Sequence, residues 1–291
     1  MKRARQMKTI DAQPKRSAAV FVVITCLVSW AFIWIVHAGL HLTPGVFPLV
    51  LMWIPGVVSI TMRLAFHEGF ADAGFRTGAP RYWLWAYAGP LALGTATYLM
   101  AALLQQVHLT PYLKQQSMMG LPFRLPWWNA DLGSAGLLAQ RFLVTSALGV
   151  AIGFVYGLGE EIGWRGYLLP KLIQGGARYP IFISGLVWAI WHAPFVLLFY
   201  ERHPVANALL YALACLTFGV FISWLRLVSG SVIIAALAHS AYNTFLQEFY
   251  DYSFVGPNKW FWAGDVGLLC SLSCGALALW LYRTRRMPVG A

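Results

Sequence analysis

Charged side chains are scarce in this chain, because Asp, Glu, Lys and Arg make up only 11% of its 291 residues. Soluble globular proteins carry about 25% charged residues. Hydrophobic residues reach 59%, which excludes an ordinary soluble domain and predicts a polytopic membrane protein. The formal net charge of +11 does not point to nucleic acid. Its basic residues cluster at the ends of apolar runs, where anionic lipid head groups and membrane topology account for them.

Cysteines are also few, and their placement does not form a disulfide framework. All four lie in apolar segments, at Cys26, Cys215, Cys270 and Cys274. Cys270 and Cys274 share a helix face, but no second cysteine pair accompanies them to complete a metal site. We interpret them as small apolar residues without a metal or redox role. The chain also lacks an H-E-x-x-H motif, an evident internal repeat and a second domain.

Long apolar runs, in contrast, are abundant. A membrane-spanning helix needs about 20 apolar residues, and eight segments qualify. They predict an all-α, polytopic membrane helix bundle with about eight transmembrane helices. The segments are Ala18–Ala38, Val46–Phe66, Arg81–Leu104, Leu137–Leu158, Pro180–Tyr200, Val205–Leu225, Ser231–Phe249 and Phe261–Tyr282.

The runs predict a single transmembrane domain over residues 18–283, with its active-site core in 137–249. Short tails flank it at 1–17 and 284–291. We interpret the first run as a retained span rather than a cleaved signal peptide, because it is long and no clear A-x-A site ends it. The basic tail at 1–17 is expected to be disordered and to lie near a negatively charged membrane face. The connection Gln105–Ala135, which contains several Pro and Trp residues, is expected to lie in the interface or to cover an opening.

The basic residues divide unequally between the two sides of such a bundle. With the N-terminus inside, sixteen of the 21 Lys and Arg residues lie on the cytoplasmic side. The five on the other side are Lys114, Arg124, Arg141, Arg202 and Lys259. The positive-inside rule therefore predicts an integral, multi-pass membrane protein with both termini in the cytoplasm.

Ionisable residues inside the apolar runs are rare, and they gather on three helices. A charge near the bilayer centre costs about 2.5–3.5 kcal/mol on insertion scales, so a chain that keeps such groups there uses them. Members of the second and third sets are four residues apart and share a helix face. The sets are Glu160, Glu161 and Arg165 in GLGEEIGWRGY, Trp188 and His192 in the fifth run, and His239 and Asn243 in the seventh.

Each set has a purely structural interpretation. His192 alone is the kind of histidine that bonds a backbone carbonyl, and His239 alone is the kind that joins two helices. Glu161 and Arg165 form an i,i+4 ion pair that leaves Glu160 unmatched. Taken together, three polar sets on three helices favour one water-accessible site over three coincidences.

The ordered set E-E-x-x-x-R, aromatic-x-x-x-H and H-x-x-x-N resembles the CAAX-protease and bacteriocin-processing family of intramembrane endopeptidases. The resemblance covers residues 155–243 and departs from the family at Trp188, where Phe is usual. The family includes the prenyl-protein endopeptidase of the endoplasmic reticulum and many bacterial members with unknown substrates. It implies hydrolysis of a peptide bond near the cytoplasmic membrane face, in prenylated CAAX-type or other membrane-associated peptides or proteins.

Peptide hydrolysis in a bilayer needs a water, a base and donors for the developing oxyanion. We expect Glu160 to be the base and His192 to hold the attacking water. His239 and Asn243 are expected to donate hydrogen bonds to the oxyanion, as the resemblance also implies.

Three further residues, Glu161, Arg165 and Trp188, are expected to support this set. We expect no cofactor, because the resemblance is compatible with a glutamate-activated water. Zinc is the alternative, since both histidines together with Glu160 can hold it and leave a position open for water.

Two other functional classes stay open. A proton-coupled transporter also places Glu and His near the midplane, although the lack of a repeat argues against it. A non-catalytic membrane scaffold or immunity protein would bind a partner and cleave nothing.

Overall fold

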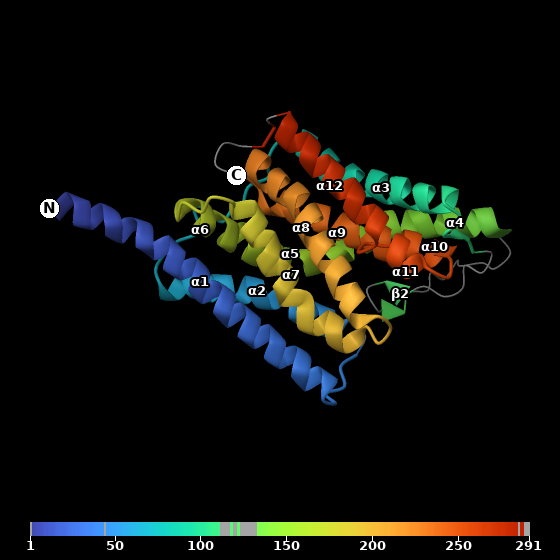
Figure 1. Ribbon diagram of the computed structural model, residues 1–291, viewed down its shortest axis with the longest axis horizontal. Coiled ribbons are helices and arrows are strands. Elements are labelled where there is room, and N and C mark those ends of the chain that lie inside the picture. The colour runs from blue at the N-terminus through green and yellow to red at the C-terminus, as the bar shows by residue number, and fades with distance from the viewer. Residues whose placement is uncertain are drawn as a thin grey trace.

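The computed structural model describes residues 2–43, 45–110, 117–118, 121–122, 133–284 and 286–287. Within these residues the chain is a bundle of helices (Figure 1). The helices are α1 (Lys2–His37), α2 (Val46–Ala65), α3 (Pro80–Leu103), α4 (Gly133–Val144), the π-helix η2 (Thr145–Gly149), α5 (Val150–Gly163), the π-helix η3 (Trp164–Leu168), α6 (Leu169–Gln174), α7 (Pro180–Phe199), α8 (Pro204–Ser229), α9 (Val232–Asn243), the π-helix η4 (Thr244–Tyr250), α10 (Asp251–Ser253), α11 (Lys259–Trp262) and α12 (Leu268–Arg283). Strand β1 (His108–Leu109) pairs with β4 (Phe254–Val255), and β2 (Ser117–Met118) pairs with β3 (Leu121–Pro122), both antiparallel.

The all-α membrane bundle predicted from the apolar runs is confirmed. In the part of the chain that the structure describes, five helical stretches are long and apolar enough to cross a membrane. They are Gln13–His37, Val46–Ala65, Ala135–Gln174, Pro180–Phe199 and Pro204–Ser229. The other three predicted spans are helical as well, in α3, in α9 with η4, and in α12.

Two sequence predictions differ from the structure. The tail at 1–17 was expected to be disordered, but its residues 2–17 belong to α1, which begins at Lys2. The eighth predicted span, Phe261–Tyr282, is interrupted after Trp262 and resumes as a helix only at Leu268. The interruption has a local cause, because Gly264 adopts a φ of +85° and the carbonyl of Asp265 accepts a hydrogen bond from Tyr242. Most of the connection Gln105–Ala135 lies outside the described residues.

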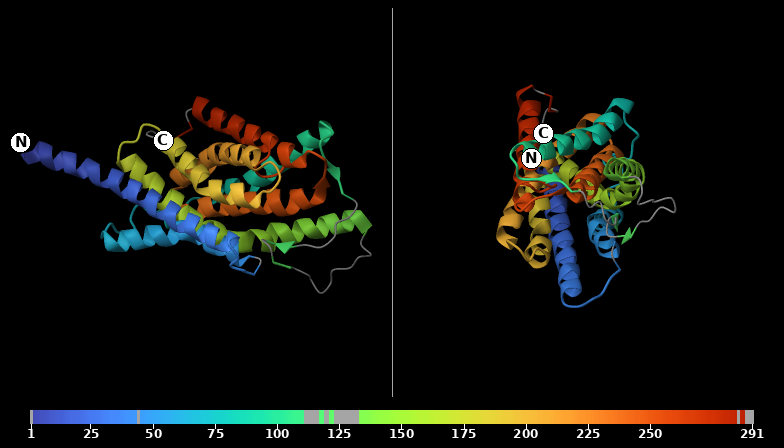
Figure 2. Two further views of the ribbon diagram at one scale, coloured as in Figure 1. Left: turned by 60° about the horizontal axis from the view of Figure 1, so that its bottom comes forward. Right: turned by 90° about the vertical axis from the view of Figure 1, so that its right-hand side faces the viewer.

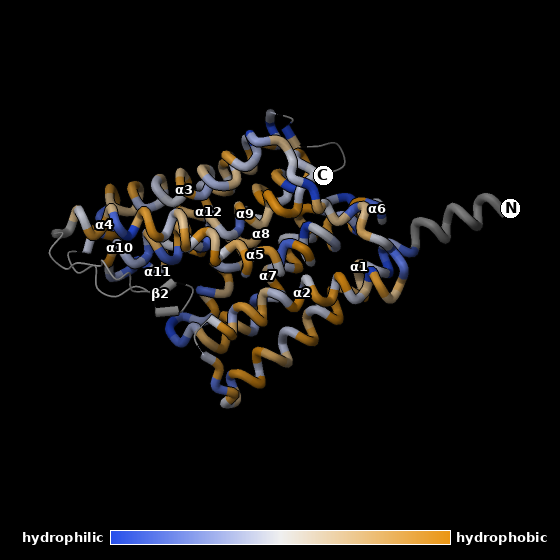
Figure 3. Tube along the Cα trace, turned by 180° about the vertical axis from the view of Figure 1, so that it is seen from behind, coloured by the Kyte–Doolittle hydropathy of each residue, from blue (hydrophilic) through white to orange (hydrophobic). Residues whose placement is uncertain are grey.

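The outer surface of the bundle suits a lipid environment. Large apolar side chains are exposed along the outer helices, including Leu27 on α1, Leu84 on α3, Phe182 on α7 and Leu209 on α8. Hydrophobic residues dominate the lengths of the helices, and hydrophilic residues gather toward the two ends of the bundle (Figure 3). All four cysteines are buried and unpaired.

Helix α5 packs between α2 and α9, and small residues allow both neighbours to come close. A Cβ at Gly159 would meet the carbonyl oxygen of Met52 on α2 at 2.7 Å. A Cβ at Gly157 would lie 3.3 Å from the carbonyl oxygen of Ala236 on α9. Small residues therefore let protein enclose this part of the chain, and every residue from 159 to 169 is buried.

The two ends of the bundle differ in what they contain. One end, here called the basic end, holds the start of α1, helix α6 and the last turn of α12 (Figures 1 and 2). The other end, here called the mouth end, holds the connection between α7 and α8 together with α10 and α11 (Figure 1).

Candidate active site

The predicted site residues of three helices meet at one cavity. Glu160 of α5, Trp188 and His192 of α7, and His239 and Asn243 of α9 all line a cavity of about 830 Å³. The rings of Trp188 and His239 lie 5.4 Å apart between centroids, and those of Trp188 and His192 lie 5.6 Å apart. Residues 28 to 78 positions apart in sequence are therefore brought into direct contact.

The carboxylates sit where an α-helix becomes a π-helix. Glu160 and Glu161 occupy the last turn of α5, and η3 begins three residues later at Trp164. Single π-turns inside α-helices occur frequently at functional sites, because the extra residue redirects side chains. Here Trp164 and Arg165, at the start of η3, both reach back to the carboxylates.

Glu160 is held by one of its two oxygens. Its Oε2 accepts a hydrogen bond from the indole N–H of Trp188 at 2.6 Å and from that of Trp164 at 3.1 Å. No hydrogen bond among the described residues involves Oε1. The side chain is 2% exposed and lines the cavity. The carboxylate is thus fixed in orientation while one oxygen stays available.

Glu161 does not line the cavity but lies behind it. Its Oε1 accepts from Arg165 at 3.0 Å and lies 2.8 Å from Nδ1 of His239. Both carboxylate and guanidinium are fully buried. The predicted i,i+4 pair is present, and the same carboxylate oxygen also orients the histidine of α9. The guanidinium of Arg165 further lies 4.6 Å from the ring of Trp188.

His192 has a defined orientation as well. Its Nδ1 lies 2.9 Å from the carbonyl oxygen of Trp188, one turn earlier in α7. A carbonyl only accepts, so Nδ1 carries the proton, and Nε2 of the neutral ring is an acceptor. The ring packs against Trp191 and Tyr211, with centroids 4.6 and 4.7 Å away. His192 therefore bonds a backbone carbonyl through Nδ1, as a structural histidine would, and keeps Nε2 available for a role in the site.

Asn243 is the last residue of α9, immediately before η4. It is half-buried and lines the cavity. Within the described residues, no hydrogen bond involves its side-chain amide. This side-chain amide has no protein partner, so it is available to hydrogen-bond a group bound in the cavity.

The cavity reaches the surface at the mouth end. Beyond the site residues it is lined by aromatic side chains such as Phe195 and Phe218, and then by Arg202, His203 and Asn258. Arg202 and Asn258 are exposed. The mouth is therefore at the end of the bundle away from α6. The start of α1 and the last turn of α12 lie at the opposite end of the bundle (Figure 1).

Two contributions to the site were not identified from the sequence. Trp164 was given no role, although its position four residues after Glu160 places both on one helix face. The link between Glu161 and His239 was missed, because only the fold brings α5 beside α9. Trp188 was expected to be supporting, but its specific contact with Glu160 depends on the indole N–H that a Phe lacks.

A three-ligand zinc site would need both histidines and Glu160 close together. Among the described residues, no three His, Cys, Asp or Glu side chains are grouped so that they could hold a metal ion. Nδ1 of each histidine is directed at a protein acceptor, and one oxygen of Glu160 accepts two indole N–H groups. A zinc-bound histidine makes the same contact through its other nitrogen, so the metal alternative differs from the metal-free one in the spacing of the ligands and not in these hydrogen bonds.

Comparison with known proteins assigns the same region. Residues 138–245 match the family model described as type II CAAX prenyl endopeptidase Rce1-like. The matched range contains all seven predicted site residues, and it confirms the resemblance that their order predicts. No curated protein matches the chain at the threshold applied.

Proposed function

We propose that this chain hydrolyses a peptide bond with a water activated by Glu160, because residues 138–245 match the family model of the Rce1-like type II CAAX prenyl endopeptidases. The family match indicates an intramembrane protease of the CAAX type. The observation that carries the finer proposal is the asymmetry of the Glu160 carboxylate. One oxygen is held by two indoles and the other is free at a cavity.

In the proposed reaction, Oε1 of Glu160 takes a proton from a water that donates its other hydrogen to Nε2 of His192. The water oxygen attacks the carbonyl carbon of the scissile bond. Glu160 then returns the proton to the departing amine, which is the usual double role of a general base in hydrolysis. Fixing both groups in advance lowers the entropic cost of the attack.

The oxyanion would form beside α9. When the ring of His239 is protonated on both nitrogens, Nδ1 donates to Glu161 and Nε2 donates to the oxyanion. The unpartnered amide of Asn243 supplies a second donor. Donors that are positioned before the reaction stabilise the developing charge without reorganisation, and removing one typically costs about 10²–10³-fold in rate.

We propose that this reaction proceeds without a metal. The support is that, among the described residues, no three His, Cys, Asp or Glu side chains are grouped closely enough to hold a metal ion. The test is cleavage by purified protein after prolonged dialysis against a chelator, with the metal content measured in parallel. Full activity at negligible metal content supports the proposal. Loss that zinc restores overturns it.

The central experiment identifies products by mass spectrometry after incubation of the purified chain in detergent with membrane peptides. The peptide set includes a prenylated C-terminal tetrapeptide substrate and non-prenylated membrane-anchored peptides. Glu160→Gln is the matched control, because its amide oxygen can still accept the two indole hydrogen bonds. A defined cleavage site that disappears in this variant supports the hydrolase. A biological effect that persists in Glu160→Gln supports the scaffold class, and substrate flux without cleavage supports the transporter class.

A further inference from the structure

The cavity is directed toward one end of the bundle. Its inner part contains Glu160 and His239, and its outer part contains Arg202, His203 and Asn258, which belong to the mouth end. Helix α7 shows the direction well. It begins at the basic end, carries His192 in its middle turns, and ends at Phe199 beside the mouth. A substrate therefore reaches the site from the mouth end.

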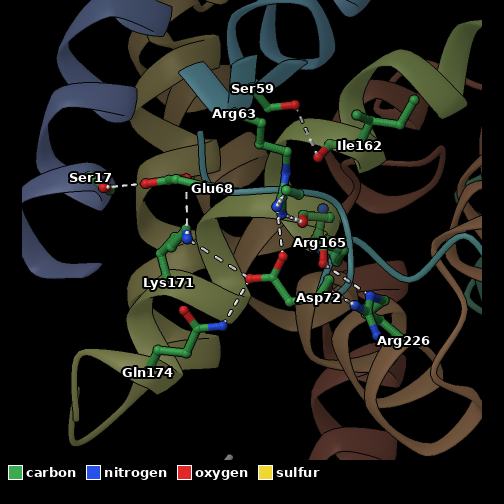
Figure 4. Close-up of polar contacts among 12 residues, drawn as sticks. Ser17, Ser59, Arg63, Glu68, Asp72, Ile162, Arg165, Lys171, Gln174 and Arg226 are labelled. Carbon is green, nitrogen blue, oxygen red and sulfur yellow. Dashed lines mark hydrogen bonds and ion pairs between the residues drawn. The ribbon is translucent and has the colours of Figure 1, made fainter. Parts of the chain in front are cut away.

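The opposite end carries most of the positive charge, and the structure separates the basic residues that bear on topology from those that do not. Arg63, Arg165, Lys171 and Arg226 are between 0% and 8% exposed. Arg165 is bonded to Glu161. The other three are bonded to acidic side chains or backbone carbonyls inside the protein (Figure 4). Such internal groups are not free to interact with lipid head groups.

The asymmetry persists when the buried groups are left out of the count. Arg141, on the other side, is 2% exposed and is removed by the same criterion. Sixteen basic residues against five become twelve against four. The excess on short flanking segments is what sets orientation in a bilayer. The end with α6, the start of α1 and the last turn of α12 is thus the cytoplasmic end.

We propose that the cavity opens on the extracytoplasmic face of the membrane, and that its substrate is a membrane-anchored peptide presented on that face. This proposal rests on the function proposed above. It replaces hydrolysis near the cytoplasmic face and makes a cytosolic prenylated protein a poor substrate. The aromatic walls formed by Trp191, Phe195 and Phe218 suit apolar side chains next to the scissile bond.

A labelling experiment tests the orientation without requiring activity. Arg178→Cys and Arg202→Cys form a matched pair, because both positions are exposed and they flank the two ends of α7. The four native cysteines are buried, so the unsubstituted chain gives the background. A membrane-impermeant maleimide is applied to intact cells that produce the full chain, and again after permeabilisation.

Arg202→Cys is expected to label equally in intact and permeabilised cells, and Arg178→Cys only after permeabilisation. Labelling of Arg202→Cys that requires permeabilisation overturns the proposal. Asn258→Cys repeats the mouth measurement, so that misfolding of one variant, detected as aggregation in size-exclusion chromatography, does not decide the result.

A second experiment separates failure of this proposal from failure of the proposed function. A quenched fluorescent peptide with an acyl anchor and a charged, impermeant head is added to the outside of intact cells. Its cleavage by the native chain and not by Glu160→Gln supports the proposal. If the same peptide is cleaved in detergent but not outside cells, the orientation is wrong and the hydrolase stands. If no membrane peptide is cleaved in detergent, the proposed function fails, and the labelling pattern still decides the orientation.

Discussion

Two buried polar clusters lie within this bundle, and they treat their charges in opposite ways. The basic-end cluster, around Asp72, places its ionic groups against protein partners (Figure 4). The cavity cluster, around Glu160, leaves an oxygen of that carboxylate, Nε2 of His192 and the amide of Asn243 at a cavity. A closed network of this kind holds helices together. An open network leaves polar groups without partners, which costs free energy that a bound group offsets. This difference supports the proposal that the second cluster is the site.

The two clusters are mechanically joined through η3. The guanidinium of Arg63 donates to Asp72 and to the carbonyl of Gly69, both at 2.6 Å, and to the carbonyl of Gly166 at 2.7 Å. Arg226 donates to the carbonyl of Arg165 at 3.1 Å. Both arginines therefore bind backbone carbonyls of the π-helix that follows the two carboxylates. The closed cluster anchors the segment on which the open cluster depends.

The largest expected effect is chemical and belongs to the open cluster. Glu160→Gln removes the proton acceptor and keeps an oxygen for the two indole donors. Cleavage of an identified peptide should fall by about 10²–10⁴-fold, the range that general bases contribute. The thermal midpoint in detergent should change little. Retained cleavage would show that Glu160 belongs to a second structural cluster and would remove the contrast between the two regions.

The next effect belongs to the closed cluster and should be the reverse, a loss of stability. Arg63→Met leaves Asp72 and two backbone carbonyls without their donor in a position that is 2% exposed. Breaking a buried ion pair on one side costs about 3–5 kcal/mol. The measurement is the free energy of unfolding in detergent micelles.

The matched control for this substitution is Arg178→Met, an exposed position where the change should stay within about 0.5 kcal/mol. Equal stability of the two variants would show that the Asp72 cluster does not hold the bundle together.

A smaller effect tests how the open cluster orients its carboxylate. Trp188→Phe keeps an aromatic ring beside Arg165 and removes the N–H that donates to Glu160 at 2.6 Å. Hydrogen bonds to charged groups contribute about 1.5–3 kcal/mol. We expect the turnover number to fall about tenfold or more.

Trp191→Phe is the comparison for this variant, because in the described part of the chain the Trp191 indole N–H has no partner. The rate should fall less than in Trp188→Phe. An equal loss in both variants would mean that ring volume and not the hydrogen bond is what the site needs.

The sequence supported the membrane class, the helical segments and the convergence of three helices, because each depends on local composition or i,i+4 spacing. The pair Glu161 and Arg165 is of this kind. The contact of Glu161 with His239 is not, since nothing in a single helix indicates that α5 lies beside α9.

The closed cluster was missed for the same reason. Arg63, Asp72, Lys171 and Arg226 come from separate segments, and each appeared to be an ordinary residue at the end of a span. The count of basic residues also treated Arg63 and Arg226 as determinants of membrane topology. Both are buried and bond to partners inside the protein. The direction of the cavity could not be predicted, because it depends on how α7 and α8 pack against α2 and η4, which no single helix indicates.

The smallest expected effect is the pH dependence of stability, which the closed cluster should dominate. Burial alone would raise the pKa of Glu68, but hydrogen bonds from Ser17, Tyr167 and Lys171 outweigh it and hold this pKa below its ordinary value. Burial alone would also raise the pKa of Asp72. Hydrogen bonds from Arg63 and Gln174 and the positive charges of Arg63 and Lys171 outweigh it and hold this pKa below its ordinary value.

Both carboxyl groups therefore bind protons less readily in the folded chain than in the unfolded chain, whose pKa values are about 4.3 for Glu and 3.9 for Asp. Their contribution is complete above about pH 5 and is lost as the pH falls through the lower folded pKa values. The thermal midpoint in detergent should drop over this acidic range. Asp72→Asn keeps an acceptor for Arg63 but does not titrate, so its midpoint should start lower at neutral pH and fall less steeply. A slope equal to that of the native chain would assign the acid sensitivity to other carboxyl groups, and the closed cluster would then differ from the open one in packing alone.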